Sequence, residues 1–164
     1  MTVREHSQVA QSLELRRATA TDRDALITMY LRFEPKGAYL GLPPRKDPGH
    51  WLDQLRSFQN FLVMVAGKVV GHAVLCPEGD SGEVAVFIEQ GHRHRGLGRM
   101  LLSKIIDEAR RLRLRRVWCL TELDNRPMRR LARSLGFATG DNPYEMYLDP
   151  KKQTRIPDVG ALAA

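Results

Sequence analysis

A short glycine-rich segment in the middle of the chain is the clearest candidate for a binding site. It stands between an apolar run (84–88) and a long amphipathic one, and it reads Arg93-His94-Arg95-Gly96-Leu97-Gly98-Arg99. The first amides of a helix have no acceptor within the helix, and the positive end of the helix dipole lies there. Glycines let the backbone approach a ligand closely, so successive amides can surround a phosphate, and the arginines add attraction. The pattern predicts an anion site, with a solvated glycine turn as the alternative.

The same segment differs from the two commonest nucleotide-binding motifs. No Gly-Lys-Ser/Thr follows it, as a P-loop requires. The third glycine of the dinucleotide fingerprint is missing, and no acidic residue ends a following strand where that fingerprint needs one. We therefore expect a phosphate site of another kind.

Other residues capable of chemistry have a structural explanation that we prefer. His92 and His94 form a His-x-His pair, but no third ligand of suitable spacing follows, so we expect no metal. Cys76 and Cys119 form neither a disulfide ladder nor a ligand cluster and are expected to be passive thiols. The net charge of +7 and the basic run at 110–116 would attract nucleic acid. That run falls at a predicted helix end, where cations complement the dipole and face solvent.

The elements around the glycine-rich segment follow from the spacing of apolar residues. Alternation predicts strands, and apolar residues three and four positions apart predict helices. Thr21 with Asp24 is expected to cap the first helix, as a variant of the capping box. Asp124 or Asn125 is expected to cap the last helix, which should end at Gly136. We expect strands at 13–19, 83–88, 115–121 and 144–148, and two more in a hairpin over 61–76 that turns at 67–68. Helices are expected from 21 to 33–35, at 49–59, at 97–112 and from 125 to 136. A loop is expected at 34–49 and a turn at 77–82.

This order of elements, β-α-α-β-β-β-α-β-α-β, predicts a mixed α/β (α+β) sheet with helices on both faces. The length of 164 residues suits one domain. We divide the chain into a flexible N-terminal arm (1–12), a domain (13–149) and a C-terminal tail (150–164). No apolar run approaches the ~20 residues that span a membrane, and the first residues lack an apolar signal core. A cytoplasmic protein is therefore expected.

Several segments together resemble the GCN5-related N-acetyltransferase (GNAT) superfamily. RHRGLG is similar to its Arg/Gln-x-x-Gly-x-Gly/Ala pyrophosphate loop. LRRATATDRDAL resembles its opening strand and helix, VAGKVVGHAVL its second hairpin, and LDNRPMRRLARSLGF its late strand-helix segment. The stretches GEVAVFI, RGLGRMLL and DNRPMRRLARSLGF are most similar to bacterial protein lysine acetyltransferases of the Pat type. The resemblance covers residues 13–149 and implies a GNAT fold, a central mixed sheet whose fourth and fifth strands splay apart.

The resemblance also implies acetyl-CoA as the co-substrate, bound where those two strands separate. In the family, the pantetheine arm lies in this gap and pairs with the fourth strand. Asn125 matches the asparagine that contacts the arm, and Met128 is expected beside it, although a helix cap explains Asn125 equally well. The implied backbone partners of the arm are Val86, Phe87 and Ile88, and the implied pyrophosphate ligands are Arg93, His94, Arg95, Gly96, Gly98 and Arg99.

Glu83 is the residue that the resemblance implies as general base, because Pat-like and histone-type members carry a glutamate at the start of the fourth strand. A lysine amine with a pKa of ~10.4 is mostly protonated at neutral pH and must lose a proton before it attacks. A carboxylate beside an apolar strand can have its pKa raised and accept that proton. The alternative is a solvated carboxylate at a strand end. A backbone N–H of the fourth strand, such as that of Phe87, would stabilise the oxyanion.

Two positions depart from the family pattern. Ala132 stands where many members have a tyrosine that protonates the leaving thiolate. Tyr144, Tyr147 and Ser134 are near in sequence, but the sequence selects none of them. His94 stands where relatives often have glycine, so a positive φ there would strain the loop.

The sequence thus predicts an N-acetyltransferase that moves an acetyl group from acetyl-CoA to a primary amine, on a protein lysine or a small molecule. Tyr39 and Leu42, in the Pro/Gly-rich loop, are the expected walls of the acceptor site. A non-catalytic acyl-CoA-binding regulatory module is the first alternative, and a basic nucleic-acid-binding protein is a less favoured one. No membrane partner is expected, and a homodimer is an option.

Overall fold

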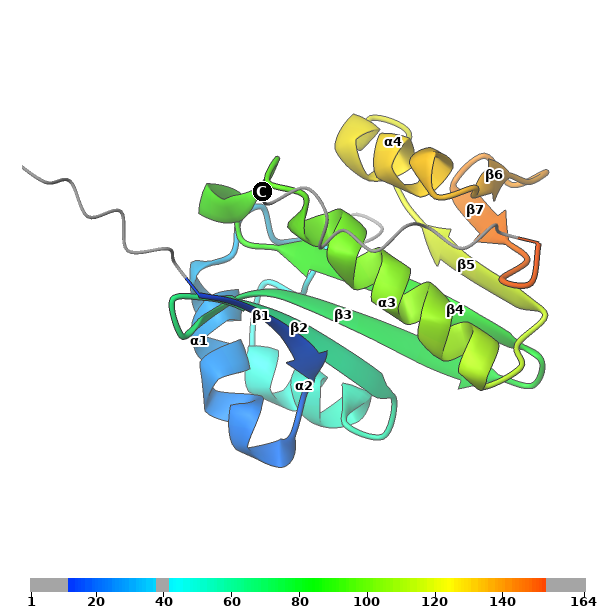
Figure 1. The fold of residues 1–164 in the computed structure, drawn as a ribbon. Helices are drawn as coiled ribbons and strands as arrows, with labels where there is room; N and C mark the ends of the chain where they lie inside the picture. The colour runs from blue at the N-terminus through cyan, green and yellow to red at the C-terminus, as the bar shows by residue number, and fades with distance from the viewer. Residues whose placement is uncertain (1–11, 38–41, 153–164) are drawn as a thin grey trace, which may run out of the picture.

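The computed structural model describes residues 12–37 and 42–152, and its fold is built on one mixed sheet (Figure 1). Seven strands lie in the order β1-β2-β3-β4-β5-β7-β6. Every neighbouring pair is antiparallel except β4 and β5, which are parallel. The predicted mixed sheet is confirmed. The strands are β1 (Leu13–Arg17), β2 (Gln59–Val65), β3 (Lys68–Glu78), β4 (Ser81–Ile88), β5 (Arg116–Leu120), β6 (Ala138–Thr139) and β7 (Glu145–Leu148).

Helices cover both faces of this sheet, as expected (Figure 1). Buried apolar residues form one cluster on each face. The larger cluster packs α3 and α4 onto the sheet, and the smaller one packs α1 and α2. β4 supplies both by alternation, since Val84 belongs to the larger cluster and Phe87 to the smaller. The helices are α1 (Arg23–Arg32), α2 (Pro48–Leu55), α3 (Leu97–Arg111) and α4 (Arg126–Ser134), with 3-10 turns at Ala20–Asp22 and Gln90–His92.

The helix α3 carries the apolar stripe that its sequence predicted. Its buried side chains recur every three or four residues, which places them on the face against the sheet. They are Leu97, Leu101, Leu102, Ile105, Ile106 and Ala109. The stripe begins at the first residue of the helix, so packing fixes the N-terminus of α3 beside the end of β4.

The expected capping box of Thr21 and Asp24 is not formed; a capping box instead joins Thr19 and Asp22 around the 3-10 turn Ala20–Asp22, which leads into α1. The Asp22 carboxylate accepts a hydrogen bond from the Thr19 amide at 2.7 Å and forms a bidentate pair with Arg16, with both distances 2.8 Å. This arginine holds the pKa of Asp22 well below its usual range. Asp22 is buried and Asp24 is exposed, so pairing with β1 decides which carboxylate forms the cap.

The turn between β3 and β4 and the edge of the sheet also differ from the prediction. The turn expected at 77–82 contains only Gly79 and Asp80, because β3 continues through Pro77 to Glu78, which pairs with Ser81. Proline has no backbone N–H to donate to a strand ladder, so the composition around Pro77 favoured a loop. At the end of a hairpin, however, a strand tolerates proline. The two-residue strand β6 was not predicted; it pairs with β7 at the edge of the sheet. Residues 1–11 of the proposed arm, most of the proposed tail and Tyr39 lie outside the described residues.

Candidate active site

The parallel strands β4 and β5 part soon after they begin. Within the described residues they pair over three positions, from Ser81 with Arg116 to Glu83 with Trp118. Beyond this point β4 continues along β3 to Ile88, while β5 continues along β7. The edge of β4 that faced β5 therefore has no ladder partner over residues 84–88 in the part of the chain that the structure describes. This is the splayed pair of strands that the resemblance implied.

The direction of the β4 backbone decides which groups reach this gap. The Glu89 amide donates to the Val70 carbonyl at 2.9 Å, on the β3 side. Backbone groups of alternate residues point to the same side of a strand, so the Phe87 N–H also faces β3. The N–H groups of Val86 and Ile88 then face the gap. The expectation that Phe87 offers its backbone to the pantetheine arm and to the oxyanion was wrong; its ring, not its amide, faces the site.

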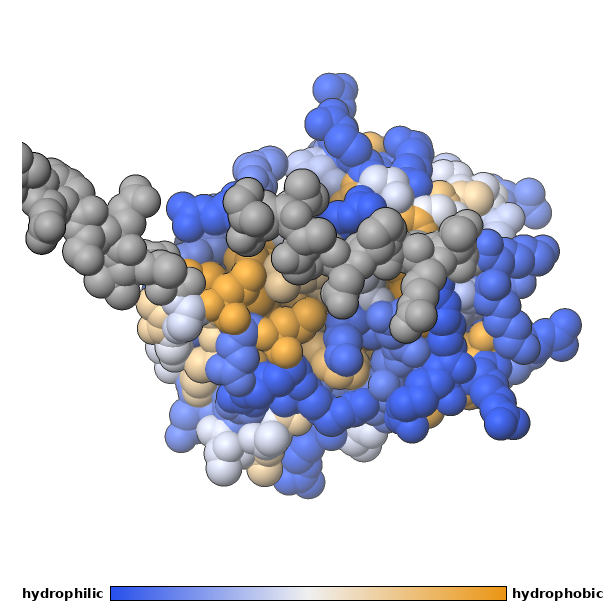
Figure 2. All heavy atoms as spheres, viewed as in Figure 1, coloured by the Kyte–Doolittle hydropathy of each residue, from blue (hydrophilic) through white to orange (hydrophobic). Residues whose placement is uncertain are grey.

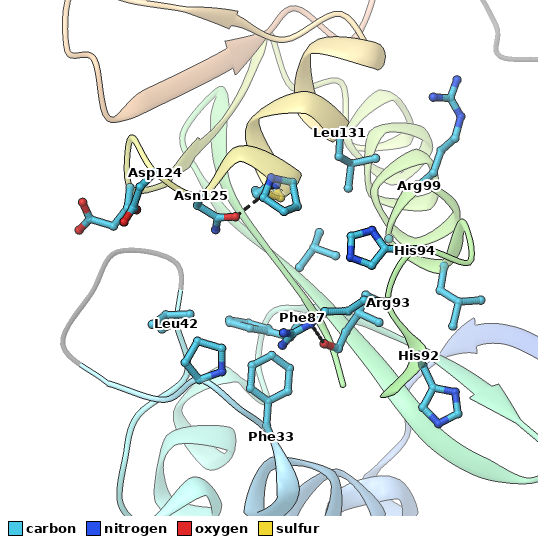
Figure 3. A pocket seen from close by; sticks show the side chains of 18 of the residues that line it. Phe33, Leu42, Phe87, His92, Arg93, His94, Arg99, Asp124, Asn125 and Leu131 are labelled. Carbon is cyan, nitrogen blue, oxygen red and sulfur yellow. Dashed lines mark hydrogen bonds between the residues drawn. The ribbon is translucent and has the colours of Figure 1, made fainter. Parts of the chain in front are cut away.

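A cavity of about 860 Å³ opens at the divergence (Figure 3). Its walls come from the end of β4, the glycine-rich segment, the loop after β5, the first half of α4 and the segment after α1. The lining residues are Phe33, Pro35, Lys36, Leu42, Val86, Phe87, Ile88, His92, Arg93, His94, Gly96, Leu97, Gly98, Arg99, Glu122, Leu123, Asp124, Asn125, Pro127, Met128, Leu131 and Tyr144. The volume suits a cofactor or a small-molecule ligand.

The glycine-rich segment turns sharply into α3. His94 has φ 60° and Gly96 has φ 78°, both in the left-handed region, so the strained histidine expected from the sequence is present. Among the described hydrogen bonds, none has a donor amide at 93–96, and the first helical amides lack acceptors by geometry. A Cβ on Gly98 would lie 3.2 Å from the Leu131 side chain, so this glycine lets α3 approach α4 closely. The segment thus presents a row of unpaired amides, as an anion site requires.

The three arginines of the glycine-rich segment differ in their contacts. The Arg93 side chain donates to the Ile88 carbonyl at 2.8 Å and to the Glu34 carbonyl at 2.5 Å, and it stacks on Phe33. Burial lowers the pKa of Arg93. Its guanidinium ties the end of β4 to the segment after α1, so its amide is the group left for a phosphate. Arg99 lines the cavity and donates to Ser134 at 2.9 Å, whereas Arg95 is exposed and outside the lining.

Asn125 and Met128 both line the cavity at the start of α4. The Asn125 Oδ1 accepts a hydrogen bond from the Met128 amide at 3.2 Å, which makes Asn125 the N-cap (Figure 3). Of the two candidate caps, Asn125 rather than Asp124 performs this role. The cap uses the side-chain oxygen, so the amide nitrogen of Asn125 stays available to a ligand in the cavity.

Glu83 lies at the apex of the divergence and outside the cavity lining. Its neighbours across the sheet are Cys76 in β3 and Trp118 in β5, and Trp118 in turn faces Tyr147 in β7. By alternation the Glu83 side chain is on the same sheet face as the Phe87 ring. Partial burial raises the pKa of Glu83, which is the direction that a general base for an amine needs.

Ser134, Tyr144 and Tyr147 are the three candidates for the general acid, and the structure places them differently. Ala132, at the position of the family tyrosine, is 0% exposed and belongs to the core. Ser134 accepts from Arg99 and donates to the Leu131 carbonyl, and Arg116 covers the ring of Tyr147 at 4.4 Å. Tyr144 lines the cavity and is 39% exposed. Of the three, Tyr144 is the one that reaches the cavity.

Several lining residues were not predicted. Phe33 and Lys36 follow α1, and Leu131 lies on α4. Phe33 belongs to a cluster of aromatic rings, in which it lies edge-on to Phe87 and tilted to Tyr30. The Pro/Gly-rich composition after α1 was a usable signal for a loop, and the family resemblance implied that this loop contacts the acceptor. Whether that loop returns towards the cavity depends on tertiary packing, which its composition does not encode.

A buried polar chain also escaped the sequence analysis. The Tyr30 hydroxyl lies 2.7 Å from the His72 Nδ1, and the His72 Nε2 lies 2.9 Å from the Asn60 Oδ1. Because Asn60 donates its amide nitrogen to the Leu55 and Phe58 carbonyls, its oxygen must accept. His72 therefore carries its proton on Nε2 and accepts from Tyr30 at Nδ1. Burial lowers the pKa of His72 to about 4, so the ring is neutral.

The two cysteine thiols are not activated in this structure. Burial is the main cause that raises the pKa of both the Cys76 and Cys119 thiols to about 11, which keeps them protonated. In the part of the chain that the structure describes, no three His, Cys, Asp or Glu side chains gather as metal ligands would. None of the helices within that part has the length and apolarity that crossing a membrane requires.

One strand edge and one amide loop converge on a single cavity in this fold, an arrangement that suits a ligand with an extended polar tail and a phosphate group. Residues 21–137 match the Acetyltransferase (GNAT) family, and the chain belongs to that family. It is accordingly an N-acetyltransferase that uses acetyl-CoA.

Solved structures of other proteins share this fold. A ribosomal-protein-alanine N-acetyltransferase from Brucella melitensis has 24% identity and a TM-score of 0.68, with 83% of this chain and 99% of that one covered. The yncA protein of Salmonella typhimurium, solved with its cofactor acetyl-CoA, has 24% identity and a TM-score of 0.67, with 90% and 98% covered. The GNAT domain of S. lividans PAT has 15% identity and a TM-score of 0.73, with 88% and 99% covered. At these identities the similarity establishes the fold and no more. Membership of the Pat-type subgroup therefore stays a prediction.

Proposed function

We propose that this enzyme acetylates a primary amine, on a protein or a small molecule, by direct attack on acetyl-CoA with Glu83 as general base. The observation that carries the proposal is the meeting of two features at one cavity. The free edge of β4 and the unpaired amides of residues 93–99 both open onto it. A strand edge and an amide loop suit a ligand with an extended polar tail and a diphosphate.

The residues of the cavity fit acetyl-CoA in this arrangement. The amides of the glycine-rich segment would hold the diphosphate, and the Val86 and Ile88 backbone groups would pair with the pantetheine arm. The Asn125 amide nitrogen and Met128 would contact the same arm from α4. The bound co-substrate supplies the thioester carbonyl, and we assign its hydrogen-bond donor to the Val86 or Ile88 amide, because these face the gap.

The direction of the arm supports Glu83 as the base. A tail that enters from residues 93–99 and follows β4 runs towards the apex of the divergence, where Glu83 lies. Glu83 and Val86 are three positions apart, about 10 Å along a strand. A proton from the acceptor amine would cross this distance through water, and the raised pKa of Glu83 favours its acceptance.

Tyr144 is our candidate for protonating the leaving thiolate. It comes from the loop before β7, and its carbonyl accepts from the Thr121 amide at 2.9 Å, which ties this loop to the end of β5. The proton donor would therefore come from a different element than the one that carries the family tyrosine.

Calorimetry and a turnover assay test the proposal together. Acetyl-CoA should bind the purified protein, and coenzyme A should be released when a suitable amine is present. The acceptor panel should include lysine peptides, small amines and peptides with N-terminal alanine, since a protein of similar fold is a ribosomal-protein-alanine N-acetyltransferase. Failure to bind acetyl-CoA would refute the proposal, and binding without turnover on any amine would favour the non-catalytic module.

A further inference from the structure

The exposed side chain of Gln90 joins two segments that are far apart in the sequence. Its amide nitrogen donates to the Arg32 carbonyl at 2.7 Å, and its amide oxygen accepts from the Glu34 amide at 3.0 Å. Gln90 follows β4, whereas Arg32 is the last residue of α1. Most of the surface that Figure 2 shows is hydrophilic, so an exposed glutamine is ordinary by itself. What distinguishes Gln90 is that both of its amide atoms bind one distant segment.

These hydrogen bonds serve backbone groups that the end of a helix leaves without partners. The last carbonyls of a helix have no donor within the helix, and the Arg32 carbonyl is one of them. The Lys36 ammonium serves another, since it donates to the Leu31 carbonyl at 2.9 Å. A carboxamide offers the same donor and acceptor as a peptide group. Gln90 therefore pairs with the end of α1 as a short piece of neighbouring strand would.

The backbone of Glu34 is held from both sides by residues that follow β4. Its amide donates to Gln90, and its carbonyl accepts from the Arg93 side chain at 2.5 Å. Phe33 lies beside the Arg93 guanidinium, which is 5.2 Å from the ring centroid (Figure 3). Gln90 and Arg93 together thus set the position of residues 33–36 relative to the end of β4.

Residues 33–36 form one wall of the cavity. Phe33, Pro35 and Lys36 line it, whereas Gln90 does not. The groups that we assign to the coenzyme come from β4, the glycine-rich segment and α4, so this wall borders the space that is left for the acceptor. Gln90 can therefore affect the acceptor only through the segment that it holds, and not by touching a ligand in the cavity.

We propose that Gln90 is a positioning residue for the acceptor, because it holds the wall at residues 33–36 in place against the β4 edge. The inference rests on the proposed function and deepens it, since it assigns acceptor binding to a residue outside the cavity. Loss of the Gln90 side chain should not detach α1, because Arg32 also forms a bidentate pair with the buried Glu89, at 2.9 and 3.1 Å. A loosened wall would misplace the amine, and small misplacements are costly in rate.

The test is Gln90→Ala, measured with acetyl-CoA and the amine of the acceptor panel that the wild-type protein acetylates fastest. We expect kcat/KM for the amine to fall about tenfold through a raised KM, while the Kd for acetyl-CoA changes less than about twofold. Gln90→Met, of similar length but without the amide, should have the same effect. Gln54→Ala is the matched control, because Gln54 is also exposed and its contact stays within α2, 3.2 Å from His50; it should behave as the wild-type protein does.

The possible failures are distinct. If the wild-type protein does not bind acetyl-CoA, or acetylates no amine of the panel, the proposed function fails and this inference fails with it. If the wild-type protein is active and Gln90→Ala keeps its kcat/KM, the enzyme stands and the positioning role is refuted. Wild-type behaviour of Gln90→Met would also refute it, because the hydrogen bonds would then not be the cause. So would an equal loss of acetyl-CoA affinity or a large fall in melting temperature, because the substitution would then act on the whole fold.

Discussion

The buried His72 should make the stability of this protein depend on pH in a defined window. His72 is 0% exposed and has hydrogen-bond partners for both ring nitrogens while it is neutral. Protonation of Nδ1 would replace the acceptor of the Tyr30 hydroxyl with a second donor. The substitution His72→Gln removes the titrating group, so its pH profile can be compared with that of the wild-type protein.

The magnitude follows from the two pKa values. An unfolded histidine titrates near 6.5, whereas burial lowers the pKa of His72 in the folded chain to about 4. Between these values the unfolded chain binds a proton that the folded chain does not, so the free energy of unfolding falls as the pH falls. The gap corresponds to about 3 kcal/mol in total. The contribution is fully present above pH 6.5 and lost by about pH 4.

Urea unfolding from about pH 7.5 down to about pH 5 measures this effect. Between about pH 6.5 and pH 5 the wild-type protein should lose about 2 kcal/mol more than His72→Gln. Asp22 and Glu108 have lowered pKa values, that of Glu108 to about 2 through its pair with Arg111, so their contribution is lost only at lower pH. The raised pKa of Glu83 acts in the opposite direction and is common to both proteins. Parallel profiles would show that the histidine is not buried and neutral.

Three further predictions concern catalysis and the loop. Glu83→Gln should lower turnover at neutral pH and abolish the fall in rate at acidic pH that a base of raised pKa produces; an unchanged pH–rate profile would exclude this role. Tyr144→Phe should lower kcat with little change in acetyl-CoA binding, and Tyr147→Phe, outside the cavity, should not; equal effects would contradict the assignment. Gly96→Ala should cost about 1–2 kcal/mol of strain and weaken coenzyme binding in calorimetry. Gly79→Ala, also at positive φ but away from the site, should weaken only stability.

Much of the fold was predictable because its signals are local. The apolar stripe of α3 and the alternation along β4 needed nothing beyond the order of residues, and the glycine-rich segment stands between them. Asn125 and Gly136 marked the two ends of α4 for the same reason. The errors fell where a distant partner decides. Asp22 replaces Asp24 in the capping box because Arg16, on another element, pairs with it.

The amino-acid sequence by itself determined most of the elements, their order and the segment that can surround a phosphate, since these depend on periodicity and on the torsions of neighbouring residues. Only the tertiary structure decided which groups face the site. The Val86 amide, and not that of Phe87, faces the gap because the Glu89 amide bonds to Val70, a contact between strands. Tyr144 reaches the cavity because β7 pairs with β5. Register and strand order come from long-range pairing, which no local pattern encodes.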